Sequence, residues 1–355
     1  MKEITRTTDI KIQNREEILA PGRALLFDIE TTGLKKETTQ IYLIGCGSFD
    51  ETGTLTVRQW LAQSLHQEKE VTEAFLEFAS GFDILVHFNG GRFDIPYTEY
   101  RAAYNGLEVP FGHMVSMDIY RELKPAKRLL GLERMNQKAL ERFMRIKRED
   151  KMGGGELIPV FYEYARFGSS DAERLLLLHN FCDICGMAEL LPALSYGKIA
   201  RGDFTFERVN ENKNILELRY NLKTPVPYPV SVKKDTFALW ADAVTLGIDL
   251  DIFEDEFAYA LPDYKDYYYL PAEDMIIHKD VAQFVDKSRR QKATAKNCFV
   301  KKQGRFVKVP DADECEAFFR PSEGRGKSHY LEVTKISASN PNKFLQYAMD
   351  FFTCI

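Results

Sequence analysis

The sequence predicts an α/β domain with a mixed sheet at residues 1–198, followed by an α+β accessory domain at residues 199–355. Strand-like apolar runs dominate the stretch before residue 90, and helical periods dominate residues 96–200. Beyond about residue 200 the pattern changes to short alternating runs separated by turns. These three observations place the domain boundary near residue 198.

The elements of the first domain follow one another in a simple order. Residues 24–48 have the pattern of strand, turn and strand, and residues 54–60 alternate like a third strand. Residues 71–80 have helical spacing, and residues 84–88 are a short continuous apolar run, which is typical of a buried parallel strand. The order predicts an antiparallel meander, then a crossover unit, and finally a long helix through residues 175–191.

The second domain is predicted from weaker patterns. Residues 216–222 alternate, and further strand-like runs occur at residues 237–240 and 257–261. Residues 275–285 and 342–352 have helical spacing, so an α+β fold is expected rather than an all-β one.

Composition limits the function classes. The chain has 48 Lys plus Arg against 53 Asp plus Glu and a formal net charge of −5, so any attraction to nucleic acid must be local. Its six cysteines lack the spacing of a disulfide framework. No segment approaches the roughly 18 consecutive apolar residues of a membrane helix. We therefore expect a cytoplasmic protein without membrane association.

A pair of carboxylates marks the end of the first apolar run. Asp28 and Glu30 precede a Thr-Thr-Gly turn, and their spacing of two puts them on one face of a strand. Carboxylates held this close repel each other, so one must be protonated or a cation must lie between them. Oxygen ligands of this kind suit Mg²⁺ or Mn²⁺.

Two later segments supply further acids. Asp94 follows the buried strand and a glycine-containing turn, where open α/β sheets place their ligands. His179 and Asp183 are four residues apart in the long helix and therefore lie on one face. Four acids and one histidine fit phosphodiester hydrolysis with two divalent metals, in which His179 orients or deprotonates the nucleophile.

These motifs resemble those of a known family. They are similar to the motifs of the DEDD (DnaQ-like) 3′-to-5′ exonucleases, which have the ribonuclease H-like fold. Their exact residue patterns resemble those of the bacterial YprB-like group. The resemblance covers about residues 20–196. The chain carries the three motifs as Asp28-x-Glu30 followed by Thr-Thr-Gly, Asn89-x-x-x-Phe93-Asp94, and His179-x-x-x-Asp183.

The resemblance implies that Asp28, Glu30, Asp94 and Asp183 hold two Mg²⁺ or Mn²⁺ ions and that His179 serves the attacking water. The best-known branches have a tyrosine four residues before the last aspartate, or a histidine five before it. Here a histidine has the tyrosine spacing.

The same resemblance implies a set of substrate contacts. Thr32 and Leu34 resemble positions that contact the terminal nucleotide, and Asn89 and Phe93 of the second motif are expected to bind substrate as well.

Two stretches of the chain are rich in cations. The second of them also contains Phe299 and Phe306, which could stack on bases, and Arg289, Arg290, Lys292 and Lys296 are its expected nucleic-acid contacts. The first stretch could contact phosphates or could simply be a solvated face. Its cations are Lys124, Lys127, Arg128, Arg134, Lys138, Arg142, Arg145, Lys147, Arg148 and Lys151. Those of the second are Lys287, Arg289, Arg290, Lys292, Lys296, Lys301, Lys302, Arg305 and Lys308.

Two other polar motifs have ordinary structural explanations. Asp118 is expected to cap a helix. Cys182 and Cys185 lie within one helix and lack a second pair with ligand spacing, so packing is expected rather than zinc binding.

The sequence thus predicts a metal-dependent 3′-to-5′ exonuclease acting on single-stranded DNA or RNA. A structure-selective endonuclease on the same fold and a catalytically idle nucleic-acid binding module are the alternatives. The second domain is expected to hold single-stranded nucleic acid or to bind a protein partner.

Overall fold

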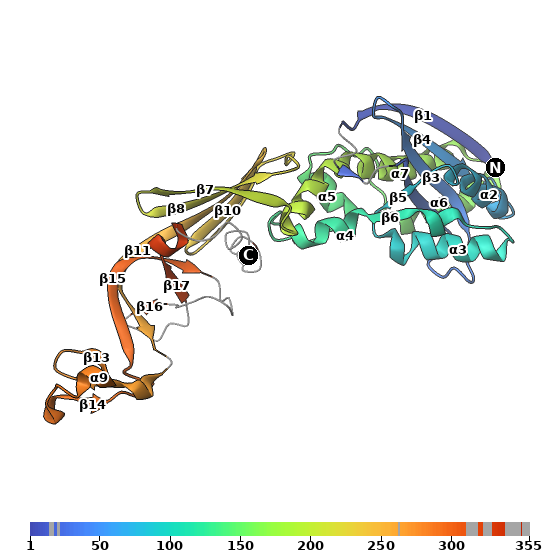
Figure 1. The fold of residues 1–355 in the computed structure, drawn as a ribbon. Helices are drawn as coiled ribbons and strands as arrows, with labels where there is room; N and C mark the ends of the chain where they lie inside the picture. The colour runs from blue at the N-terminus through green and yellow to red at the C-terminus, as the bar shows by residue number, and fades with distance from the viewer. Residues whose placement is uncertain are drawn as a thin grey trace. The chain divides into compact units, whose positions relative to one another are not determined.

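The computed structural model describes residues 1–13, 18, 19, 22–261, 263–309, 319–321, 329–337 and 349. These residues belong to two compact units. The first comprises Met1–Arg201 and Thr224–Tyr228, and the second comprises Gly202–Lys223 and Pro229–Ile355. Figure 1 shows the chain coloured from the N-terminus to the C-terminus.

The first unit is built on a mixed six-stranded sheet of order β1-β4-β3-β2-β5-β6. β2, β5 and β6 are parallel to one another, and the pairs β2–β3, β3–β4 and β1–β4 are antiparallel. The carboxyl ends of the three parallel strands therefore meet at one edge of the sheet. The strands are β1 (Lys2–Lys11), β2 (Ala24–Thr31), β3 (Ile41–Phe49), β4 (Thr54–Leu61), β5 (Ile84–His87) and β6 (Val115–Asp118).

Helices surround this sheet (Figure 1). α7 packs against β2, β3 and β4, and α2 packs against β3, β4 and α3. α7 begins where the Ser169 side chain accepts a hydrogen bond from Ala172 N–H at 3.3 Å. The helices are α2 (Glu68–Ala79), α3 (Asp94–Tyr104), α4 (Ile119–Leu123), α5 (Gln137–Phe143), α6 (Gly154–Phe167), α7 (Ser170–Leu190) and α8 (Leu194–Ala200).

Strand β2 separates an apolar face from a polar one. Phe27 is buried and its ring stacks on Phe75 of α2, with ring centroids 4.9 Å apart. The next residue, Asp28, points to the other face and accepts a hydrogen bond from Asn180 of α7 at 2.9 Å. This alternation is the one that the sequence predicts, and it turns the carboxylates of β2 toward α7.

The segment Ser170–Ala200, which contains α7, is the one candidate membrane span among the described residues, by length and composition only. In its most apolar stretch 61% of the residues are buried inside the protein. Since α7 packs on the sheet, its apolar character is accounted for as that of a core helix.

The second unit is richer in strands than the sequence predicts. Its described helices are the short α9 (Lys279–Ala282) and α10 (Val333–Ser337). The strands form an eight-stranded sheet and a three-stranded sheet. They are β7 (Phe204–Asn212), β8 (Ile215–Leu222), β9 (Val230–Lys234), β10 (Phe237–Asp242), β11 (Thr245–Ala260), β12 (Tyr267–Leu270), β13 (Met275–His278), β14 (Gln291–Lys292), β15 (Phe299–Val309), β16 (Arg320–Pro321) and β17 (His329–Glu332).

Most predicted elements of the first unit are confirmed, together with its mixed α/β class, and two strands are additions. β1 was not predicted because it lies at the sheet edge and its residues are mostly exposed, so it lacks an apolar run. β6 interrupts a region expected to be helical. The helix predicted at residues 275–285 is wrong in its first four residues, which pair with β12 as β13, and is confirmed only at Lys279–Ala282. The helix predicted at residues 342–352 lies outside the described residues, apart from residue 349.

The close approach of α7 to the sheet makes a testable prediction. A Cβ atom at Gly45 would lie 1.9 Å from Oδ1 of Asn180, so Gly45→Ala must displace the Asn180 side chain from its bonds to Asp28 and Gln59 or shift the helix. We expect a loss of roughly 1–3 kcal/mol in the free energy of unfolding, measured by urea denaturation. Gly112→Ala is the matched control, since a Cβ atom there meets nothing within 4 Å. Equal stability of both variants would contradict this packing.

Candidate active site

The first two acids of the site come from β2. Glu30 is buried and Asp28 is half-buried, although both are charged at neutral pH in water. Asn180 donates to Asp28, and Gln59 of β4 donates to the Asn180 side-chain oxygen at 2.9 Å. A chain of buried amides therefore fixes the position of the first carboxylate.

Asp94 joins them from the start of α3. The turn η1 (Gly90–Arg92) precedes it, and a Cβ atom at Gly90 would lie 3.0 Å from Oδ2 of Asp94. The backbone N–H of Ile29, between the two acids of β2, donates to Oδ1 of Asp94 at 3.4 Å. The third acid thus lies against the strand that carries the first two.

His179 and Asp183 approach from α7. Nε2 of His179 lies 3.2 Å from Oδ2 of Asp183 and 3.5 Å from Oε1 of Glu30. Ligand atoms of these three residues all lie within 4.8 Å of one another, close enough for one metal ion. The structure therefore brings the predicted acids and the histidine to one edge of the sheet.

Two site residues were missed by the sequence reasoning. A carboxylate oxygen of Asp150 is hydrogen-bonded to Nδ1 of His179 at 2.7 Å. Arg148 donates to Asp183 at 2.7 Å and to Asp150 at 3.0 Å, and it also pairs with Glu141 at 3.2 Å. Both lie in the irregular stretch between α5 and α6, where no periodicity marks them. Arg148 was predicted as a possible phosphate contact; in the structure its guanidinium is occupied by three carboxylates instead.

The site favours neutral forms of its acids. Burial, followed by the negative charges of Asp183, Glu30 and Asp94, raises the pKa of Asp28 well above its ordinary value. Burial, followed by the charges of Asp183 and Asp94, does the same to Glu30. Burial also raises the pKa of Asp94, to about 6, against the lowering effect of backbone N–H donors.

Asp150 differs from these acids. Burial alone would raise its pKa, but the Met152 N–H, Arg148 and His179 bring the pKa of Asp150 below its ordinary value. An ionised carboxylate is an acceptor only, so Nδ1 of His179 carries the proton that it shares with Asp150. Nε2 is then the ring atom that faces the other acids and can exchange a proton there.

The donor set fits a hard divalent cation. The predicted ligands are carboxylates, and burial together with neighbouring negative charges raises the pKa values of Asp28, Glu30 and Asp94. A bound cation would offset that repulsion. Gly154 at the start of α6 leaves space beside them: a Cβ atom there would lie 3.7 Å from Oε2 of Glu30 and 4.0 Å from Nε2 of His179.

The predicted terminal-nucleotide contacts lie in the loop after β2. Thr32 is buried, and its hydroxyl accepts from Gln40 N–H at 2.9 Å, so it holds the loop. Leu34 is 84% exposed. Their contact with a nucleotide stays a prediction.

Asn89 and Phe93 flank the turn before Asp94. Asn89 has a left-handed backbone with φ of 58°, and its N–H donates to Oδ1 of Asp118 at 2.8 Å. Asp118 also accepts from Tyr120 N–H at 3.0 Å as the cap of α4, which confirms its predicted role. Phe93 is half-buried against Tyr97, with ring centroids 5.2 Å apart.

The predicted nucleic-acid platform of the second unit is corrected in part. Phe306 is fully buried and packs against Phe257 and Phe319, so it cannot stack on bases. Arg289 contacts Glu273, and Arg290 donates to Ala282 O. Other cations of this stretch pair with acids: Lys301 with Asp274, Lys302 with Glu332, and Arg305 with Glu211.

Lys292 and Lys296 are exposed, and their role in binding nucleic acid stays a prediction.

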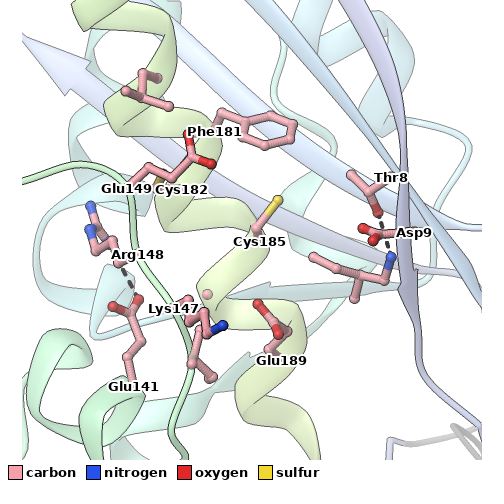
Figure 2. Close-up of a pocket in the computed structure, with 14 residues that line it drawn as sticks. Thr8, Asp9, Glu141, Lys147, Arg148, Glu149, Phe181, Cys182, Cys185 and Glu189 are labelled. Atoms are coloured by element: carbon pink, nitrogen blue, oxygen red, sulfur yellow. Dashed lines mark hydrogen bonds and ion pairs between the residues drawn. The ribbon is translucent and has the colours of Figure 1, made fainter.

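The two cysteines of α7 lie away from the acids. Figure 2 shows Cys182 and Cys185 facing a cavity of about 280 Å³, beside Thr8 and Asp9 of β1. Burial raises the pKa of Cys185 to about 12, which keeps it in the thiol form. Among the residues that the structure describes, neither cysteine belongs to a potential metal cluster. Figure 2 also shows Arg148 at this cavity, with its ion pair to Glu141.

Comparison with known proteins agrees with this fold. A family model described as the RNase_H superfamily matches residues 25–195. No curated protein matches the chain significantly. The segment that carries the site thus has a ribonuclease H-like fold and is similar to this superfamily, which supports a nuclease.

Solved structures that are similar to this chain include two of E. coli exonuclease I. One, in complex with a dT13 oligonucleotide, has a TM-score of 0.32 and 12% identity, and the match covers 55% of this chain and 54% of that chain. The other, the ExoI/SSB-Ct complex, has a TM-score of 0.29 and 11% identity, with 79% and 65% covered. The first match thus spans about half of the exonuclease I chain.

The raised pKa values predict how stability depends on pH. An acid whose pKa is raised by folding binds its proton more tightly in the folded state. In metal-free protein its contribution is therefore fully present below an unfolded pKa of about 4 and is lost as pH rises through about 6, the pKa of Asp94. We expect Asp94→Asn to raise the Tm of metal-free protein at pH 8 by at least about 2 °C, with little effect at pH 4.

Mn²⁺ should raise the Tm of the wild type at pH 8 and leave that of Asp94→Asn nearly unchanged. Glu51→Gln, an exposed turn position, controls for the loss of a charge and should respond to Mn²⁺ as the wild type does. Equal responses of all three proteins, measured by calorimetry, would contradict a metal site at Asp94.

Proposed function

We propose that the chain is a metal-dependent 3′-to-5′ exonuclease of the DEDD type that hydrolyses single-stranded DNA or RNA. The observation that carries the proposal is that Glu30, His179 and Asp183 have ligand atoms within 4.8 Å of one another. Asp28 and Asp94 lie close enough for their charges to interact with those of Glu30 and Asp183. Three segments far apart in the sequence supply these side chains. The order of these segments is that of the three DEDD motifs, and His179 has the spacing at which one branch carries a tyrosine.

In this proposal the four carboxylates hold two Mg²⁺ or Mn²⁺ ions, which would activate water and offset the charge of the leaving oxygen. The residues of the chain supply position and proton transfer. Asn180 and Ile29 N–H fix the carboxylates of Asp28 and Asp94. Arg148 holds one oxygen of Asp183 and leaves the other turned toward His179.

His179 is proposed as the general base. Because Asp150 accepts from Nδ1, the proton of the attacking water would pass to Nε2, which faces the acids. Asp150 also stabilises the imidazolium that forms, as a buried carboxylate does for a histidine base elsewhere. The unusual spacing of His179 thus still directs a ring nitrogen at the site.

The direct test is degradation of 5′-labelled and 3′-labelled single strands of DNA and RNA with Mg²⁺, Mn²⁺ or EDTA. We expect a metal-dependent ladder that shortens from the 3′ end, and no cleavage by Asp28→Ala. Internal cuts would favour the endonuclease alternative. Binding without cleavage under any metal would contradict the proposal and favour the idle binding module.

A second prediction concerns Asp150. We expect Asp150→Asn to lower kcat by roughly 10- to 100-fold, a part of what general base catalysis contributes, and to change KM little. The low-pH limb of the pH–rate profile should move, because the charge that holds the Nδ1 proton is lost. Glu149→Gln, its exposed neighbour, is the control. A uniform loss at all pH values with a lowered Tm would indicate a purely structural role.

The second unit is proposed as an accessory region that helps to hold the strand, with Lys292 and Lys296 as its exposed cations. If it instead docks a protein partner, removal of the residues after about 200 would leave activity on naked substrate unchanged.

A further inference from the structure

A cationic groove lies next to the acids in the first unit. It has a volume of about 660 Å³ and is lined by ten residues, of which four are cations and none is an acid. Its walls come from the turn after β5, from the region around α4, and from the start of α5. The residues that matter to its chemistry are Phe88, Arg92, Tyr120, Lys124, Lys127 and Arg134.

The charges of the four groove cations are not offset by acids among the residues that line the groove. Arg92, Lys124, Lys127 and Arg134 are all exposed, and none forms an ion pair with an acid among the described residues. Most described arginines of the second unit, by contrast, contact an acid directly. Four unpaired cations around one hollow repel each other, so the groove is suited to a polyanion.

Aromatic side chains share the groove with these cations. Phe88 and Tyr120 are half-buried, and their rings are tilted with centroids 6.1 Å apart. Partly exposed rings between cations form a surface on which unpaired bases stack while the backbone follows the charges. Bases inside a duplex are not free to stack in this way, which favours a single strand.

Both walls of the groove connect to the site. On one side, Asn89 and Arg92 belong to the turn that ends at Asp94. On the other side, Gln137 donates to the backbone oxygen of Asp183 at 2.9 Å. A strand in the groove therefore runs past the turn that ends at Asp94 and past Gln137, which contacts Asp183.

We propose that this groove binds the phosphodiester backbone of single-stranded nucleic acid next to the scissile bond. The inference rests on the proposed function for the location of that bond, but the binding itself does not require cleavage. It also divides the first cationic stretch: Lys124, Lys127 and Arg134 are binding residues, whereas Arg148 is a structural part of the site.

The test compares two matched double variants. Lys127→Ala/Arg134→Ala removes two groove cations. Lys69→Ala/Arg174→Ala removes an exposed lysine of α2 and an exposed arginine of α7, both outside the groove. Binding of fluorescein-labelled dT20 and rU20 is measured by anisotropy between 50 and 300 mM salt, with Ca²⁺ in place of Mg²⁺ to suppress cleavage. Thermal unfolding confirms that both variants are folded.

We expect the groove variant to bind at least one of the two strands roughly tenfold more weakly at low salt. Its plot of log affinity against log salt should become shallower by about 1.4, for two lost phosphate contacts of about 0.7 each. The control should keep the wild-type affinity and slope. Unchanged affinity and slope in the groove variant would overturn the inference.

The assay separates the two proposals. Weaker binding by the groove variant in a protein that cleaves neither strand would support the groove and contradict the exonuclease. Metal-dependent cleavage by a groove variant with wild-type KM on a 20-mer would support the exonuclease and overturn the groove.

Discussion

Mutual repulsion among buried carboxylates is the constraint on which the first unit depends. Folding places Asp28, Glu30, Asp94 and Asp183 at one edge of the sheet, where burial penalises the charges of Asp28, Glu30 and Asp94. Arg148 is the one cation that directly pairs with this group among the described residues, and it contacts only Asp183 of the four. The remaining negative charge has to be offset by bound protons or by a bound cation. The site is therefore costly for folding and specific for cations.

The helix α7 converts this constraint into geometry. It carries Asn180, whose side chain lies so close to Gly45 that a Cβ atom there would be 1.9 Å from Oδ1. The same side chain fixes Asp28. One turn brings His179 and Asp183 to the same edge, while Cys182 and Cys185 of the same helix line the cavity shown in Figure 2. A single well-packed helix thus sets the distances between groups from three segments.

The sequence predicts the parts of this arrangement that depend on local periodicity. Spacing of two in β2 and spacing of four in α7 determine which side chains share a face, and both predictions hold. The burial of Glu30 beside His179 agrees with them.

Features that depend on tertiary pairing were not accessible in this way. Asp150 lies in an irregular stretch, so only the fold reveals that it contacts His179. The cations of β15 looked free because their partners, such as Glu211 and Asp274, are distant in sequence. Phe306 lies among those cations, yet the alternation of the strand turns it into the core.

The proposed hydrolysis depends on where a divalent cation binds. Anomalous scattering from crystals grown with Mn²⁺ tests this most directly. The account predicts anomalous peaks between the carboxylates of Asp28, Glu30, Asp94 and Asp183, with the ring of His179 still held by Asp150. Peaks elsewhere on the chain, with none at this edge of the sheet, would contradict it.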